Sequence, residues 1–257
     1  MADQDGRMGI ETWEARDWKR IGMLTPSSNS VLEPVTSRML GAFGNRVTAH
    51  FGRFRVTEIS MGSASQSQFD SAPILAAADL LADAKVDVIA WNGTSASWLG
   101  FERDEALCRQ ITKATGIPAT STILALNEVM RLLGVRRLAL VTPYISEIQE
   151  RIIANYAAVG VDVVIDRRLE DRGNFSFASY APEHVARLMR EAAAAKPEAI
   201  AVVCTNFRGT DFIEAVERDT GIIVLDSIAV TLWGTLRAAG VPPSGVEGWG
   251  RLFREVA

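Results

Sequence analysis

One cysteine, Cys204, stands where an apolar run ends and a polar loop begins, in "AVVCTNFRG" (201–209). Backbone N–H groups at such a strand-to-helix turn can bind an anion and can lower the pKa of a thiol. Because an unperturbed thiol has a pKa of about 8.5, modest tuning would let Cys204 give or take a proton at neutral pH. A free cysteine can also pack as a small hydrophobe, and this alternative fits Cys108, which lies in the helical pattern "RDEALCRQITK". The loop position favours chemistry at Cys204.

A second strand end, "AWNGTSASW" (90–98), has the same form without a thiol. When the two segments are aligned, Gly93 falls on Cys204, and Thr94-Ser95 falls on Thr205-Asn206. Thr94 and Ser95 supply two hydroxyls and two backbone donors, which suit a carboxylate or the oxygen pair of an enediolate.

Two further strand ends add polar groups. Tyr144 follows Thr142-Pro143 directly, and "PSSNS" (26–30) contains Ser28 and Asn29. Serine, threonine and asparagine crowd all loops, so each residue alone is weak evidence. Their gathering at four strand ends is the stronger indication of a site.

The elements that would position these residues alternate along the chain. Apolar runs predict strands at 20–26, 50–60, 86–92, 117–121, 136–143, 161–169, 198–204 and 221–227. Helical patterns occupy 71–85, 99–115, 122–134, a stretch from 145, 182–195, 210–220 and 229–240. Strands that are continuously apolar and alternate with helices predict parallel sheets covered on both faces, in an α/β fold.

The order of the elements repeats. Thr25-Pro26 matches Thr142-Pro143, and "AKVDVIAWNGTS" matches "AKPEAIAVVCTN". "TGIPATSTILALNEVMRLLGV" matches "TGIIVLDSIAVTLWGTLRAAGV". These matches predict two quasi-symmetric, flavodoxin- or Rossmann-like lobes with the active site in the cleft between them, because ligands collect beyond the carboxyl ends of parallel strands. We expect a flexible leader at 1–18, a first lobe at 19–134 and a second at 135–227, with 228–257 packing back on the first.

Composition excludes several function classes. The 257 residues carry a formal charge of −4 and no block of Lys or Arg, so a nucleic-acid partner is not expected. The apolar runs are strand-sized and the N-terminus lacks a signal-peptide core, which predicts a cytoplasmic protein without a membrane partner. Two histidines, His50 and His184, are too few and too badly spaced for a metal site. Nucleotide-binding glycine motifs and G-x-S-x-G are absent.

Several segments resemble the aspartate/glutamate racemase superfamily, within it the branch of arylmalonate decarboxylases and maleate cis-trans isomerases. They are "RIGMLTPSSN", "NGTSAS", "LGVRRLALVTPYISEIQERI", "VVCTNFRGTDFIEAVERDTGI" and "GWGRLF". The resemblance covers nearly the whole chain and implies an enzyme without a cofactor or metal that acts on carbons next to carboxylates. Oligomeric state is left open, and a homo-oligomer is allowed.

The resemblance also implies residue roles. In the racemases and maleate isomerases both lobes present a cysteine, whereas Gly93 and Cys204 match the decarboxylase arrangement. The resemblance to the decarboxylases implies that Cys204 protonates an enediolate. It also implies that the enediolate is held by Thr94, Ser95, Tyr144 and the amide of Thr205. Asn29, in "PSSN", and Asn174 resemble the substrate-holding asparagines of the isomerases. Ser28 and Asn206 are further candidate substrate-binding residues because of their positions at strand ends.

Three hypotheses follow from these residues. The first is a decarboxylase of a malonate-type dicarboxylic acid with a single cysteine acid. The second is an isomerase or racemase of a small dicarboxylate or amino-acid-type substrate. The third is a carboxylate-binding protein that has lost catalysis.

Overall fold

The computed structural model describes residues 18–57 and 71–256. It contains two four-stranded sheets, and every strand pair in both is parallel. The predicted leader at 1–18 falls almost wholly outside the described residues, as does the end of the strand predicted at 50–60. The predicted α/β class with two parallel sheets is confirmed.

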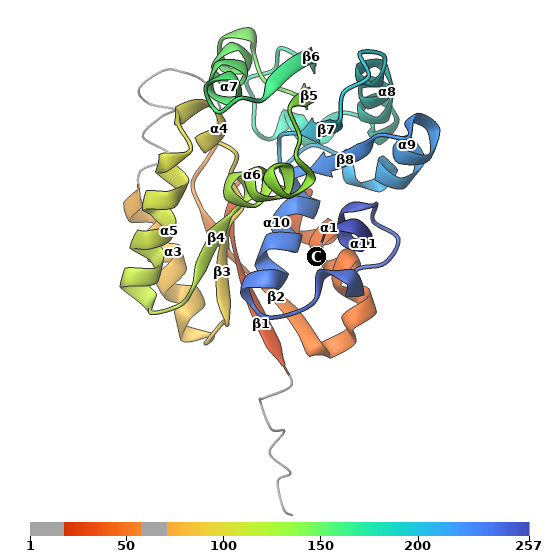
Figure 1. Ribbon diagram of the computed structural model, residues 1–257. Helices are drawn as coiled ribbons and strands as arrows, with labels where there is room; N and C mark the ends of the chain where they lie inside the picture. Colours follow the sequence, from red (N-terminus) through yellow and green to blue (C-terminus); the bar gives the residue numbers. More distant parts are fainter. Residues whose placement is uncertain (1–17, 58–70, 257) are drawn as a thin grey trace, which may run out of the picture.

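The first sheet has the strand order β2 (Val47–Phe54), β1 (Lys19–Pro26), β3 (Val88–Trp91) and β4 (Ala119–Ser121). The helices that follow its strands are α1 (Leu32–Met39), α3 (Ser71–Asp83), α4 (Ala96–Leu99), α5 (Glu102–Thr115) and α6 (Thr122–Leu133), with the 3₁₀ segment η2 (Leu40–Arg46). In Figure 1, α3 and α5 cover one face of this sheet, and α10 and α1 lie on the other.

The second sheet repeats this order as β6 (Asp162–Arg168), β5 (Arg137–Thr142), β7 (Ala199–Val202) and β8 (Ile223–Asp226). Its helices are α7 (Ser146–Ala158), α8 (Pro182–Ala193), α9 (Ile213–Thr220), α10 (Ser227–Ala238) and α11 (Leu252–Glu255). Short 3₁₀ segments are η4 (Ser176–Ser179), η5 (Thr210–Phe212) and η6 (Pro243–Gly245).

Helix α10, which follows the last strand of the second sheet, crosses to the first sheet, where it packs against α6, β4, β3 and α1 (Figure 1). Gly234 lies at the contact with α6, where an added Cβ would stand 2.7 Å from Cβ of Ala125. Helices can approach this closely only where one contributes no side chain. We propose the lobe limits 19–134 and 135–227, with α10 and α11 completing the surface of the first lobe.

Two helices differ from the sequence prediction. The helix predicted at 99–115 is divided at Gly100, whose φ of 111° ends α4 before α5 begins. Helix α1 was not predicted, because "LEPVTSRM" is short and has Pro34, Val35 and Thr36, which favour a helix least, at its centre. It buries Leu32, Val35 and Met39, so packing against the core supplies what local propensity does not.

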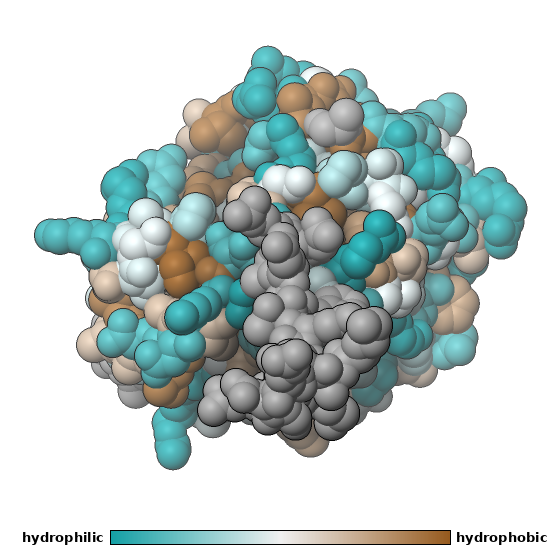
Figure 2. All heavy atoms as spheres, turned by 90° about the horizontal axis from the view of Figure 1, so that it is seen from below, coloured by the Kyte–Doolittle hydropathy of each residue, from teal (hydrophilic) through white to brown (hydrophobic). Residues whose placement is uncertain are grey.

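The continuous apolar strands are buried, as a sheet covered on both faces requires: β3, β7 and β8 are buried along their whole lengths. Figure 2 shows the underside of the molecule, whose visible coloured part is largely hydrophilic with separate hydrophobic areas. No helix within the described residues is long and apolar enough to cross a membrane.

Candidate active site

A small cavity lies between the lobes at the carboxyl ends of β1, β3, β5 and β7. Its volume is about 20 Å³, close to the space of a single water molecule. Seven residues singled out from the sequence line it: Gly93, Thr94, Ser95, Tyr144, Asn174, Cys204 and Thr205. The structure thus brings together strand ends that are far apart in the chain. Ser28, Asn29 and Asn206 lie beside the cavity rather than in its wall.

Cys204 follows the end of β7 and is 3% exposed. Its own N–H donates to Ser227 Oγ at 3.1 Å, and the Asn206 N–H donates to Cys204 Sγ at 3.4 Å. The expected lowering of the thiol pKa is wrong: burial raises the pKa of Cys204 to about 12, against the smaller opposing effects of Asn206 and Tyr144. The facing lobe excludes the water that would stabilise a thiolate, so Cys204 is a protonated thiol at neutral pH.

Tyr144 joins the two lobes at this cavity. Its hydroxyl and Thr94 Oγ1 are 2.6 Å apart, and it also lies close enough to Cys204 to affect its pKa. The ring is held edge-on by Trp98 and Phe177, with centroids 5.2 and 5.7 Å away. Burial raises the pKa of Tyr144 well above its usual value of 10, so the hydroxyl keeps its proton and remains a donor.

The loop before α4 presents backbone donors to the cavity. Within the described residues, the N–H groups of Gly93, Thr94 and Ser95 donate to no acceptor, because α4 begins only at Ala96. The amide of Thr205 on the facing loop is in the same condition. These unpaired amides, with the hydroxyls of Thr94 and Tyr144, form a cradle of donors at the cavity, and donors of this kind can stabilise negative charge on oxygen.

The cavity wall carries no charge among the described residues: no Lys, Arg, His, Asp or Glu lines it. A carboxylate there would be held by neutral donors alone. No cluster of three or more metal-ligating side chains occurs in the described part of the chain.

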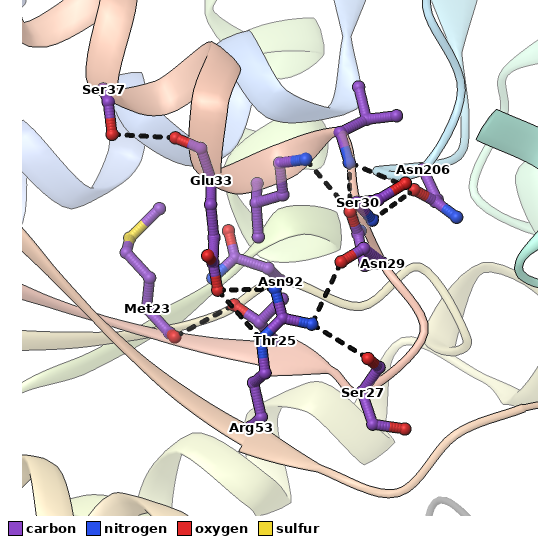
Figure 3. Close-up of polar contacts among 12 residues, drawn as sticks. Met23, Thr25, Ser27, Asn29, Ser30, Glu33, Ser37, Arg53, Asn92 and Asn206 are labelled. Atoms are coloured by element: carbon purple, nitrogen blue, oxygen red, sulfur yellow. Dashed lines mark hydrogen bonds and ion pairs between the residues drawn. The ribbon is translucent and has the colours of Figure 1, made fainter.

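Asn29 and Asn206 use their amides to join the lobes (Figure 3). Asn29 Oδ1 accepts from the N–H groups of Val31 and Leu32, both at 3.0 Å, and its Nδ2 donates to Thr205 Oγ1 at 3.1 Å. Asn206 Oδ1 accepts from the Ser30 N–H at 2.9 Å. These side-chain amides therefore hold the loops in position. Their place in the sequence could not show whether they hold loops or bind a substrate.

Asn174 and Ser28 form a second link between the lobes. Asn174 Nδ2 donates to Ser28 Oγ at 2.8 Å, and the Asn174 carbonyl accepts from Asn206 Nδ2 at 2.6 Å. The Ser28 hydroxyl in turn donates to the carbonyl of Val56 at 2.6 Å. Asn174 lines the cavity, whereas Ser28 does not line it and contacts its wall through the hydrogen bonds with Asn174 and Val56.

Gly93 has no room for a side chain. A Cβ built on it would lie 2.0 Å from Cζ2 and 2.3 Å from Cε2 of the Trp91 indole. Its φ is outside the left-handed region that favours glycine, so space rather than backbone conformation is what requires glycine.

Sequence reasoning did not single out four other lining residues: Pro26, Val56, Asn92 and Trp98. Asn92 is fully buried, and its Oδ1 has no hydrogen-bond partner in the described structure. Pro26, Asn92 and Trp98 fall at strand ends that were named as site segments, so position rather than residue type was their only signal. Val56 follows β2, and the end of that strand was not among the segments predicted to form the site.

Two parallel-sheet lobes that enclose a cysteine and converging neutral donors define an enzyme of the aspartate/glutamate racemase superfamily type. Residues 35–253 match the family model described as arylmalonate decarboxylase, and the chain belongs to that family.

Relatives with two activities share its architecture. The chain is 29% identical over 236 residues to arylmalonate decarboxylase of Bordetella bronchiseptica, covering 90% of this chain and 98% of that protein. A Nocardia farcinica maleate cis-trans isomerase variant with a covalently bound succinylcysteine intermediate superposes with a TM-score of 0.84 at 25% identity, covering 93% and 99% of the two chains. An arylmalonate decarboxylase variant with one glycine changed to cysteine and one cysteine to serine, in its liganded form, superposes with a TM-score of 0.80 at 26% identity, covering 92% and 99%.

Proposed function

We propose that this protein is a cofactor-independent decarboxylase of a small malonate-type dicarboxylic acid, with Cys204 as the proton donor. The observation that carries the proposal is the pairing of one protonated, buried thiol with a facing glycine that has no space for a side chain. A second base or nucleophile is thereby missing from the first-lobe wall.

The reaction uses the cradle as follows. The bond between the α-carbon and one carboxylate breaks, carbon dioxide leaves, and the electron pair moves into the retained carboxylate as an enediolate. Its oxygens accept hydrogen bonds from the Tyr144 hydroxyl and the loop amides at Thr94 and Ser95. The Cys204 thiol then gives its proton to the α-carbon, and the resulting thiolate takes a proton from water.

The uncharged wall of the cavity supports this order of events. A cationic side chain beside the departing carboxylate would stabilise the substrate more than the transition state, because that carboxylate leaves as neutral carbon dioxide. An uncharged wall takes the departing carboxylate out of water without giving it a counter-ion. The hydrogen bonds from the neutral donors to the retained carboxyl group become stronger as negative charge concentrates on its oxygens. Protonation of Cys204 by burial suits a donor of protons better than a nucleophile, because the nucleophilic form of cysteine is the thiolate.

The relatives support the same assignment. In the arylmalonate decarboxylase variant, one glycine is replaced by cysteine and one cysteine by serine, and this chain has a glycine and a cysteine in the walls of its cavity. The described cavity is small, so the simplest malonates are the first substrates to test.

A second candidate function is cis-trans isomerisation of a maleate-like dicarboxylate. It is favoured by Asn174, which lines the cavity and whose Nδ2 has a second hydrogen atom beyond the one donated to Ser28 Oγ, so that it can donate to a substrate carboxylate. The succinylcysteine of the maleate isomerase relative shows that a thiol in this fold can add to such a substrate. Cys204 would then have to lose its proton before adding.

Carbon dioxide release from malonate, methylmalonate and phenylmalonate tests the first function. We expect Cys204→Ala to lower kcat by at least about 10²-fold, the usual contribution of a general acid. Cys108→Ala is the matched control, because Cys108 is also buried but lies in α5 away from the cavity. Proton NMR of maleate in deuterium oxide tests the isomerase. Fumarate formation without carbon dioxide release from any malonate would replace the first proposal by the second.

A further inference from the structure

Strand register places Trp91 and Val202 at equivalent positions in the two lobes. Trp91 pairs with Leu24 of β1 and Ser121 of β4. Val202 pairs with Val141 of β5 and Asp226 of β8, the corresponding strands of the second sheet. Each is followed two residues later by the residue that faces the cavity, Gly93 in one lobe and Cys204 in the other.

The pair Trp91–Gly93 and the pair Val202–Cys204 differ in which of the two residues carries the larger side chain. In the second lobe, the isopropyl group of Val202 precedes the thiol-bearing residue. In the first lobe, the indole of Trp91 extends beneath Gly93 and occupies the space where a side chain would begin. A large residue with glycine in one lobe thus stands where a small residue with cysteine stands in the other.

The Trp91 ring is packed in the core. The residue is 1% exposed, and its ring packs against Phe54 with centroids 5.0 Å apart. Trp91 also borders a second hollow of about 280 Å³, which Ser95 and Asp104 line as well. Its Nε1 is buried, and the indole opposes the rise in the pKa of the neighbouring Asp104 carboxyl, which burial brings to about 7. A side chain at position 93 would therefore have to displace a packed core residue rather than a mobile one.

We propose that Trp91 restricts position 93 to glycine: its indole keeps the wall opposite Cys204 free of a proton-transfer group. The inference rests on the proposed function and deepens it. With Trp91 and Gly93 in place, a proton reaches the α-carbon from the Cys204 side alone, so a substituted malonate gives one enantiomer. With a thiol on each wall, one thiolate would remove the α-proton of the product while the other thiol returns a proton to the opposite face, which is racemisation.

The test introduces the second-lobe residue types, valine and cysteine, at positions 91 and 93 of the first lobe. Four proteins are compared with wild type: Gly93→Cys, Trp91→Val, the double variant with both changes, and Gly93→Cys combined with Trp233→Val. Trp233 is the matched control, because it is also a fully buried tryptophan but lies in α10, where its Nε1 donates to the carbonyl of Val256.

Two readouts need no substrate. Gly93→Cys alone is expected to lower Tm by about 2–10 °C through overpacking. Adding Trp91→Val should lower Tm by less than the sum of the two single effects, whereas adding Trp233→Val should be additive. Alkylation of the introduced thiol by iodoacetamide, followed by peptide mass spectrometry, should be at least about tenfold faster in the Trp91→Val background, where the thiol can reach its place in the wall.

The third readout uses the purified product acid of a substituted malonate. The double variant should exchange the α-proton in deuterium oxide and lose optical purity, and both single variants should do so at least about tenfold more slowly. The inference is overturned if Gly93→Cys is tolerated without loss of Tm and its thiol reacts equally fast in both backgrounds. If wild type releases no carbon dioxide while the Tm coupling and thiol rates behave as expected, the proposed function fails and the role of Trp91 stands.

Discussion

The hydroxyl of Tyr144 offers a sharp test of the cradle, because Tyr144→Phe removes one oxygen and leaves the ring in place. The ring remains packed between Trp98 and Phe177. The change deletes the 2.6 Å hydrogen bond with Thr94 and leaves the Thr94 hydroxyl without that partner in a buried position. Such a loss costs about 1–2 kcal/mol of the free energy of unfolding, or roughly 2–8 °C in Tm.

The loss in activity should be larger than the loss in stability. One oxyanion donor contributes about 10²–10³ in kcat, which corresponds to about 2.7–4 kcal/mol of transition-state stabilisation. Tyr144 also lies beside the Cys204 thiol, so its removal changes the surroundings of the proton donor. We expect Tyr144→Phe to lower kcat for carbon dioxide release by at least 10²-fold (about the loss of one such donor), while KM changes much less.

Tyr156→Phe is the matched control for this measurement. Tyr156 is also fully buried, but its hydroxyl has no hydrogen-bond partner in the described structure. Its replacement should leave kcat unchanged and Tm unchanged or slightly higher, because no bond is lost and an unsatisfied polar group is removed. Equal losses of kcat in the two variants, or full activity in Tyr144→Phe, would refute the assignment of Tyr144 to the cradle.

Three further predictions concern stability. Asn206→Ala removes two hydrogen bonds between the lobes and one within the second lobe, and it should cost about 2–4 kcal/mol in urea unfolding, whereas an undiminished midpoint would mean the bonds are not formed in solution. Burial raises the pKa of both Asp104 and Asp226 to about 7, so between about pH 4 and pH 7 the folded state holds protons that the unfolded state has released. The free energy of unfolding should therefore fall as the pH rises from about 4 to 7. Asp226→Asn should remove up to about 1.4 kcal/mol per pH unit of that fall, measured by denaturation at pH 5, 6 and 7. Gly234→Ala should destabilise by about 1–3 kcal/mol through contact with Ala125, although alanine is the better helix former, and a gain in Tm would show that α10 and α6 are further apart.

The sequence predicted most of the fold because its signal was repeated. Parallel strands buried on both faces must be continuously apolar, and this feature located β3, β7 and β8 in the sequence. The edge strand β2 is only partly buried, and its prediction at 50–60 begins three residues after its start at Val47. Helix α1 was missed because the packing of Leu32 and Met39 forms it, and such tertiary packing leaves little trace in a window of eight residues. The break at Gly100 was missed because a glycine within a helical pattern is often tolerated.

The location of the cavity was predictable, but the use of each polar group in it was not. Strand ends at the same edge of parallel sheets must meet, so Thr94, Tyr144 and Cys204 could be grouped from sequence. Whether an amide binds substrate or fixes a loop depends on neighbours from the other lobe, as for Asn206 and Ser30. The direction of the Cys204 pKa depended on the same fact, because the facing lobe removes the water that a single strand end would keep.

The duplication separates structural requirements from functional ones. At the equivalent positions Ser121 and Asp226, both lobes use a side-chain oxygen to cap the following helix, α6 or α10, so the two residues differ while the local task is the same. At Gly93 and Cys204 the local task differs as well, because one wall of the cavity ends in bare backbone and the other in a thiol. The backbone at Gly93 is unstrained, and it is the Trp91 indole of the same lobe that leaves no space for a side chain there. The second lobe has Val202 at the equivalent position and carries the thiol, so the two walls differ through a pair of residues in each lobe, and a proton delivered to one face of a substrate needs an acid from only one of them.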